Sequence, residues 1–409
     1  LCGGAWAHLG RGKRFFSPVD GTELCRFPFI DGATAEAAVE AAAREASAWG
    51  QTPLDERCRR VADCIASLKQ HRELLAKVLL WEIGKPYAQA LQSVDRCISG
   101  VEWYLGQIGP MMQGRRPLGL VSNIASWNYP LSVLVHAVLV QALAGNSVIS
   151  KTPSDGDLLA LTISMALARR AGLPVSLVSG SGGQLSGALV THHDIACMAF
   201  VGGKTSGRGI AATLYDKKKR YMLEMEGINA YGIWDFSQWD KLAAQLKKGF
   251  DYGKQRCTAY VRLVVQRSLF PQFLEMYLGM LQSLKVGNPA LVDSPDAPLP
   301  NVDFGPVINA AKVEELDGMV NEAIGGGALR LYQGRLPEAA FLPDQDMSAY
   351  YAPTALLGVP RSGALYHSEP FGPVDTIVVV DRVEALVAEM NVSNGSLVAS
   401  LACDDEAFA

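Results

Sequence analysis

The sequence predicts an α/β protein in which helices cover parallel sheets, and three observations lead to this fold class. The 409 residues are 49% hydrophobic and 19% charged, enough for a large core, and at ~100–200 residues per domain we expect two or three domains. From residue 118 onward, apolar runs of strand length alternate with helical segments, which is typical of a parallel sheet with crossover helices. A second series of this kind begins around Tyr221.

The segment before residue 118 is predicted to be mainly helical. Residues 17–21 (SPVDG) have the composition of a turn between two strands. Alanine-rich helical patterns follow over residues 34–49 and 54–83. The second pattern ends at Gly84 and Pro86, because both residue types stop helices.

The alternating region is predicted as a series of strands and crossover helices. Strands are expected at residues 118–124, 147–150, 175–179 and 198–201, and helices at residues 131–143, 155–171, 184–191 and 205–215. In the second series, helices are expected near 242–248, 269–284 and 312–324, and strands at 260–265 and 376–380. Ligands of parallel sheets bind beyond the carboxyl ends of the strands. The loops after the strands are therefore the first places to search for a site.

The charge pattern argues against two classes of partner. The net charge is −4, whereas nucleic acids and anionic membranes are bound by clustered basic faces. The basic cluster at residues 217–220 (KKKR) is interpreted as a solvated loop before a strand. The eight cysteines contain no CxxC pair, so a structural zinc site is not expected, and they fit reduced thiols in the cytoplasm.

Three loops after predicted strands carry polar groups that suit a ligand. Asn128 offers a short amide that could donate to an oxyanion. Lys151 and Ser154 offer a cation and a hydroxyl that suit a ribose or a phosphate. Gly203 lies in a turn that enters a helix, where backbone N–H groups bind anions. Each loop alone is more commonly a solvated turn.

Cys257 is the candidate nucleophile. It lies at the junction of a helix and a strand, where the N–H groups of a helix N-terminus would lower the pKa of the thiol and hold an oxyanion. The alternative is an inert packing cysteine, which is the more common case for a free thiol. Glu224 is expected at a strand end before a glycine turn, either as a catalytic base or as an exposed carboxylate.

Six short motifs follow one another along the chain. They are SWNYP at residues 126–130, KTPS at 151–154, FVGG at 200–203, LEMEG at 223–227, QRCTA at 255–259 and EPFGP at 369–373. They are similar to the P-W-N-F-P, K-P-S, F-T-G-S, L-E-L-G-G, G-Q-x-C-x-A and E-I-F-G-P motifs of the aldehyde dehydrogenase superfamily. Each motif is weak by itself. Together and in this order, they make nearly the whole chain resemble that superfamily.

The resemblance implies two parallel-sheet, Rossmann-like domains and a short bridging or oligomerisation segment. Residues 1–223 would bind the cofactor, with the bridging segment at about 100–118, and residues 224–409 would form the catalytic domain. Past the position of Ala409, the family usually continues with a glycine-rich segment and an oligomerisation strand. This C-terminal segment of the family is therefore expected to be absent here. A homodimer or homotetramer is also implied.

The resemblance also implies a reaction. In the family, a cysteine thiolate attacks an aldehyde, and the oxyanion that forms is held by an asparagine amide and by the cysteine N–H. Hydride then passes to NAD or NADP, and a glutamate activates the water that hydrolyses the thioester. These roles fall on Cys257, Asn128 and Glu224, and no catalytic metal is involved. The implied cofactor-binding residues are Trp127, Lys151, Ser154, Gly203, Glu369 and Phe371. Because a serine at 154 cannot repel a 2′-phosphate, we expect NADP to be accepted at least comparably with NAD.

Three positions depart from the family motifs. Lys254 stands where a glycine usually precedes the glutamine, Tyr252 where an asparagine is common, and Glu226 where the first glycine of a pair belongs. Two other functions therefore stay open. One is an acylating aldehyde dehydrogenase, against which the presence of Glu224 counts, and the other is a non-catalytic scaffold of the same fold.

Overall fold

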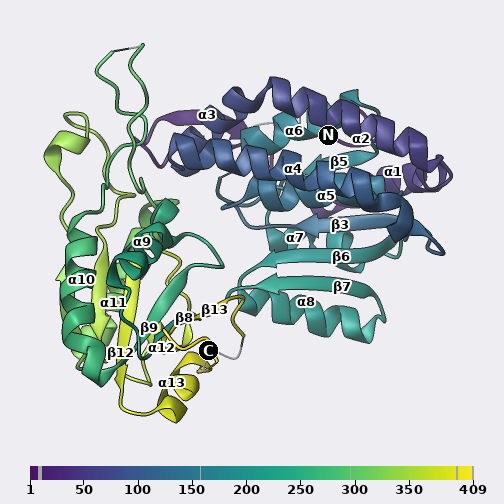
Figure 1. Ribbon diagram of the computed structural model, residues 1–409. Coiled ribbons are helices and arrows are strands. Elements are labelled where there is room, and N and C mark those ends of the chain that lie inside the picture. Colours follow the sequence, from purple (N-terminus) through teal and green to yellow (C-terminus); the bar gives the residue numbers. More distant parts are fainter. Residues whose placement is uncertain (8–11, 157, 295, 393–394, 408–409) are drawn as a thin grey trace. The chain divides into compact units, whose positions relative to one another are not determined.

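The computed structural model describes residues 1–7, 12–156, 158–294, 296–392 and 395–407. The chain divides into two compact units (Figure 1). The N-terminal unit comprises residues 1–17, 22–83 and 90–225, and the C-terminal unit comprises residues 18–21, 84–89 and 226–409. The predicted division into a cofactor-binding domain (residues 1–223) and a catalytic domain (residues 224–409) stays a prediction.

The N-terminal unit contains a five-stranded sheet of order β5-β4-β3-β6-β7 in which every neighbouring pair is parallel. Its strands are β3 (Leu120–Ile124), β4 (Ser147–Lys151), β5 (Val175–Val178), β6 (Ile195–Gly202) and β7 (Arg220–Met225). The segments that connect them are the π-helix η1 (Pro130–Val135), α5 (His136–Leu143), α6 (Leu158–Arg170), α7 (Gly182–Ser186), the π-helix η2 (Gly187–Thr191) and α8 (Lys204–Asp216). The predicted alternation of strands and helices is confirmed.

Strands β3, β4 and β5 are buried along nearly their whole length because both faces of this part of the sheet are covered. Helix α1 (Gly32–Gly50) begins where the Asp31 carboxylate accepts a hydrogen bond from the Thr34 N–H. Four of its buried side chains, including Val39, form one cluster with Ile149 of β4. Since side chains alternate along a strand, Val148 points to the opposite face, and α5 packs against β4 as well.

Three further helices and a hairpin lie wholly or mostly in this unit. The predicted helix over residues 54–83 is wrong in one respect, because it is divided at His71 (φ −102°, ψ 14°) into α2 (Leu54–Gln70) and α3 (Arg72–Ile83). Helix α4 (Tyr87–Met112) was not predicted, and residues 100–112 of the predicted bridging segment are its last turns. The antiparallel strands β1 (Lys13–Phe16) and β2 (Glu23–Phe27) flank the predicted turn at residues 17–21.

The C-terminal unit contains a six-stranded sheet of order β10-β11-β12-β9-β8-β13, parallel except for the β10–β11 pair. The strands are β8 (Asn229–Ile233), β9 (Tyr260–Gln266), β10 (Leu329–Gln333), β11 (Thr354–Leu357), β12 (Val374–Val380) and β13 (Ala399–Ala402). The helices are α9 (Trp239–Gly249), α10 (Phe270–Gln282), α11 (Ala310–Gly325), α12 (Ala364–His367), α13 (Val383–Met390) and the 3-10 turns η3 (Asp251–Lys254), η4 (Arg267–Leu269) and η5 (Glu338–Ala340).

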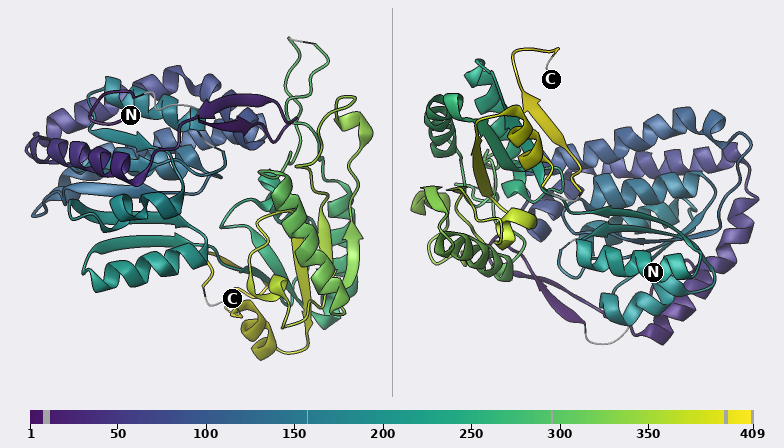
Figure 2. Two further views of the ribbon diagram at one scale, coloured as in Figure 1. Left: turned by 180° about the vertical axis from the view of Figure 1, so that it is seen from behind. Right: turned by 90° about the horizontal axis from the view of Figure 1, so that it is seen from below.

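Strand β9 is one of the two central strands of this sheet, and helices lie on both sides of the sheet (Figure 2). Leu263 lies in a cluster with Phe250, at the C-terminal end of α9, and with Phe273 of α10. The next residue, Val264, lies in a different cluster together with Leu386 of α13. The turn that precedes β9 and carries Cys257 is therefore attached to a rigid strand.

Among the described residues, no helix is long and apolar enough to cross a membrane.

Candidate active site

The N-terminal unit brings several predicted site residues to one edge of its sheet. Asn128 lies in the loop after β3, Lys151 is the last residue of β4, Gly203 follows β6, and Glu224 is the penultimate residue of β7. These four strands are neighbours, and in their registers Ile124 pairs with Lys151 and Val201 pairs with Glu224. All these loops therefore open at the carboxyl edge of the sheet, where ligands of such sheets bind.

The loop after β3 carries Trp127 and Asn128. Asn128 is buried, with 5% of its surface exposed, and Trp127 is half-buried. Pro130 begins η1 directly afterwards, where the ring fixes φ and no backbone N–H is needed. The amide of Asn128 is thus fixed between a central strand and a helix start.

The loop after β4 provides a buried ammonium group. The Nζ atom of Lys151 donates to the carbonyl oxygen of Thr152 at 2.7 Å. Burial lowers the pKa of Lys151, while nearby Asp155 acts in the opposite direction. The Thr152 hydroxyl is buried and has no hydrogen-bond partner among the described residues, and Ser154 is exposed. A buried hydroxyl without a partner next to an ammonium group fits a ligand that carries hydroxyl or phosphate groups.

The turn after β6 leads into the N-terminus of α8, a kind of site that favours anions. Gly203 is the N-cap residue of this 13-residue helix, and no side chain of the described residues caps it. A Cβ atom on Gly202 would lie 2.7 Å from the Phe200 ring, and one on Gly207 would lie 2.5 Å from Sδ of Met225. The backbone is packed too closely for side chains here, and the N–H groups at a helix N-terminus suit a pyrophosphate. Together with the Lys151 loop, this turn fits a dinucleotide cofactor.

In the C-terminal unit, Cys257 lies in a turn between η3 and β9. The expectation that it lies at a helix N-terminus is wrong, because the preceding helix α9 ends at Gly249 and a strand follows the turn. A helix dipole therefore does not account for reactivity of this thiol. Gln255, which is fully buried, holds the turn by donating to the carbonyl oxygens of Tyr252 and Pro306 at 3.1 Å each.

Glu369 and Phe371 lie just before β12, the parallel neighbour of β9. Because Cys257 lies just before β9, all three residues belong to the amino edge of this sheet. Glu369 is buried, with 6% exposed, and Phe371 has a left-handed backbone with φ +50°. A Cβ atom on Gly372 would lie 2.5 Å from Leu316, so the segment after Phe371 packs closely onto α11. The predicted site residues thus form two groups, one on each unit.

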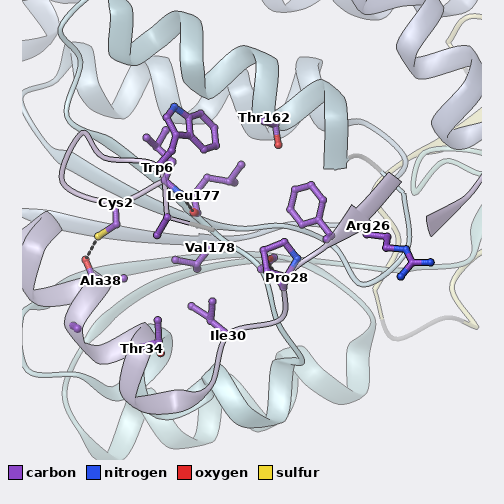
Figure 3. A pocket seen from close by; sticks show the side chains of 15 residues that line it. Cys2, Trp6, Arg26, Pro28, Ile30, Thr34, Ala38, Thr162, Leu177 and Val178 are labelled. Carbon is purple, nitrogen blue, oxygen red and sulfur yellow. Dashed lines mark hydrogen bonds between the residues drawn. The ribbon is translucent and has the colours of Figure 1, made fainter. Parts of the chain in front are cut away.

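Two other features of the N-terminal unit contain none of these residues. A mainly apolar cavity of about 390 Å³ is lined by the N-terminal residues, including Cys2 and Trp6, by Ile30 and Thr34, and by β5 (Figure 3). Ligand atoms of His192, His193 and Asp194 lie within 4.8 Å of one another. However, the ammonium group of Lys219 donates to the carbonyl oxygens of His192 and Ile195, and its positive charge disfavours a metal ion there.

A parallel α/β sheet with a helix N-terminus and polar loops at its carboxyl edge defines a nucleotide-binding enzyme architecture. Residues 8–409 match the aldehyde dehydrogenase family, and the chain belongs to this family. The predicted family and α/β fold are confirmed.

The relatives agree with this assignment. The chain is 27% identical to the 3,6-anhydro-alpha-L-galactose dehydrogenase of Vibrio sp. (strain EJY3), over 98% of this chain and 85% of the relative. It is 24% identical to the D-glyceraldehyde dehydrogenase (NADP(+)) of Picrophilus torridus, over 98% of this chain and 83% of the relative. A structure of 3,6-anhydro-L-galactose dehydrogenase is similar to this chain with a TM-score of 0.88 and 25% sequence identity. The match covers 100% of this chain and 87% of that structure's chain. The chain is an oxidoreductase acting on aldehyde groups with NAD or NADP.

Proposed function

We propose that this chain oxidises an aldehyde to a carboxylic acid by covalent catalysis at Cys257. The thiolate attacks the carbonyl carbon, and the oxyanion that forms accepts hydrogen bonds from the Asn128 amide and from the Cys257 N–H. The bound nicotinamide cofactor supplies the chemistry of hydride acceptance. Loss of the hydride leaves a thioester on Cys257. Glu224 then takes a proton from water, and the resulting hydroxide breaks the carbon–sulfur bond and releases the carboxylic acid.

The cofactor-binding residues of this proposal are those that the family motifs imply. Lys151 and Ser154 would contact the adenosine ribose, with Trp127 in the neighbouring loop, and the N-terminus of α8 at Gly203 would bind the pyrophosphate. Glu369 and Phe371 would contact the nicotinamide end. The observation that carries the proposal is the placement of Asn128, Lys151, Gly203 and Glu224 on four neighbouring strands at one sheet edge. The acylating and scaffold alternatives are not favoured, because the family's relatives of this chain are named as dehydrogenases of aldehydes and semialdehydes.

We also propose a small polar aldehyde as substrate, a cytoplasmic location and a homodimer or homotetramer. The two relatives named above are dehydrogenases of 3,6-anhydro-alpha-L-galactose and of D-glyceraldehyde. All eight cysteines belong to the described residues and are free thiols, which supports a reducing compartment.

The test of the reaction is the replacement Cys257→Ala. Without a nucleophile, aldehyde-dependent formation of NADH or NADPH should stop, while cofactor affinity stays close to that of the parent. The matched control is Cys403→Ala, which removes another half-buried thiol of the C-terminal unit and should keep full activity. A Cys257→Ala variant that retains about a tenth or more of the parent rate would show that the nucleophile is a different residue.

A further inference from the structure

The turn that carries Cys257 has an unusual backbone. Tyr252, Gly253 and Lys254 have φ values of 58°, 60° and 57°, so three consecutive residues are left-handed. Glycine adopts this conformation without cost, but a residue with a Cβ atom is strained there. The family motif has a glycine at the position of Lys254, whereas this chain has a lysine there with a left-handed backbone.

Lys254 is held in this conformation by a buried ion pair. Its side chain is 2% exposed, and Nζ lies 2.8 Å from Oδ1 of Asp375 on β12, whose side chain is 1% exposed. The other carboxylate oxygen of Asp375 accepts a hydrogen bond of 2.6 Å from the Tyr277 hydroxyl on α10. The ammonium group also lies 4.2 Å from the centre of the Phe250 ring. Burial lowers the pKa of Lys254, and Asp375 opposes this shift.

The same ammonium group closes the turn at its base. Nζ of Lys254 donates to the carbonyl oxygen of Tyr260, the first residue of β9, at 2.6 Å. One side chain therefore connects the two ends of the segment that contains Cys257.

A second side chain holds Cys257 itself. Nδ2 of Asn229, a fully buried residue at the start of β8, donates to the carbonyl oxygens of Cys257 at 2.7 Å and of Ala259 at 2.8 Å. Oδ1 of Asn229 accepts from the N–H groups of Leu397 at 2.9 Å and Val398 at 3.0 Å. All hydrogen-bonding positions of this amide are used, so its orientation is fixed.

We infer that Lys254 and Asn229 are positioning residues that together hold the Cys257 turn in the conformation required for attack on the aldehyde. Stability does not explain the lysine, because buried ion pairs gain little over apolar packing and the left-handed backbone adds strain. An arrangement that costs stability yet fixes both ends of the nucleophile turn is explained by the need to orient the thiol. This inference rests on the proposed role of Cys257.

The experiment compares Lys254→Met, Asn229→Ala and the double variant Lys254→Met/Asp375→Asn with the parent. Methionine keeps the unbranched, apolar part of the side chain but removes the ammonium group. The double variant leaves no unpaired buried charge, so it carries the test if Lys254→Met does not fold. The control is Lys247→Met, which removes an ammonium group of α9 that lies 3.7 Å from Asp303 outside the turn.

The expected result is a split between turnover and binding. In every variant that gives the near-UV circular dichroism of the parent, kcat should fall by about tenfold or more, while the dissociation constant of the cofactor changes less than about twofold. Lys247→Met should leave both unchanged. A folded Lys254 variant with kcat within about threefold of the parent would overturn the inference. That outcome is distinct from failure of the proposed function, which would appear as activity in Cys257→Ala.

Discussion

Glu82 provides a direct test of how burial controls the stability of the N-terminal unit. Its side chain is fully buried near the C-terminal end of α3, and its carboxylate accepts hydrogen bonds from the N–H groups of Leu159 and Ala160 in the first turn of α6. Burial raises the pKa of Glu82 from 4.5 to about 7, although the N–H groups of α6 favour the charged form. The free-energy cost of desolvating the carboxylate therefore exceeds the stabilisation that the N–H groups of the helix N-terminus provide.

The sign of the effect follows from proton binding. In the unfolded chain, Glu82 loses its proton near pH 4.5, whereas in the folded protein it holds the proton until about pH 7. Between these values the folded state binds more protons, so the contribution of Glu82 to stability is fully present below pH 4.5 and is lost as the pH rises through 7. At about 1.4 kcal/mol per pH unit, the loss over this window is about 3 kcal/mol.

The test is Glu82→Gln, which is neutral at every pH and keeps a carbonyl oxygen as acceptor for the N–H groups of α6. The free energy of unfolding in urea is measured for parent and variant at several pH values from 4.5 to 8. Relative to the variant, the parent should lose about 3 kcal/mol across this range. Glu73→Gln, which replaces an exposed carboxylate on the same helix, is the control and should follow the parent. A difference between parent and Glu82→Gln that is the same at pH 4.5 and pH 8 would refute the reasoning.

Two further predictions concern the proposed site. In Glu224→Gln, the pre-steady-state burst of reduced cofactor should remain because Cys257 is intact, whereas steady-state turnover should collapse. Equal loss of both phases in stopped-flow absorbance would assign Glu224 a structural role. The parent should use NADP at least comparably with NAD. Because a carboxylate repels the 2′-phosphate, Ser154→Glu should lower the ratio of kcat/KM for NADP to kcat/KM for NAD by roughly tenfold or more. A parent that prefers NAD by more than roughly a hundredfold would show that another residue contacts the ribose.

The sheet of the N-terminal unit was predictable because its signal is local. Each strand is a short apolar run followed by a polar loop, and the observed β4 at Ser147–Lys151 differs from the predicted strand by one residue. Once the strands are parallel neighbours, the loops after them must share one edge. The placement of Asn128 and Lys151 on that edge therefore follows from the sequence pattern alone.

The missed elements show where local patterns fail. Helix α4 has a helical spacing of buried residues, from Ala90 through Val94 and Cys97 to Val101, so a signal was present. Pro110 lies inside the same helix and obscures its end. The break at His71 has no glycine or proline to mark it. The residue after the break, Arg72, pairs with Asp95 of α4, a contact that a reading of neighbouring residues does not include.

Lys254 shows what a departure from a family motif can and cannot reveal. The sequence identified the lysine as foreign to a glycine position, and this observation is local. Its partners Asp375 and Tyr277 come from β12 and α10, and nothing in the neighbouring residues of either one marks it as a partner of Lys254. A charged residue at such a position can stay buried only if the fold supplies a counter-charge and hydrogen-bond acceptors, since an unpaired buried ammonium group is far more costly than the strain of its backbone. The burial of Lys254, which the sequence does not show, requires a buried acid elsewhere in the chain, and the packing of β9 against β12 shows that this acid is Asp375.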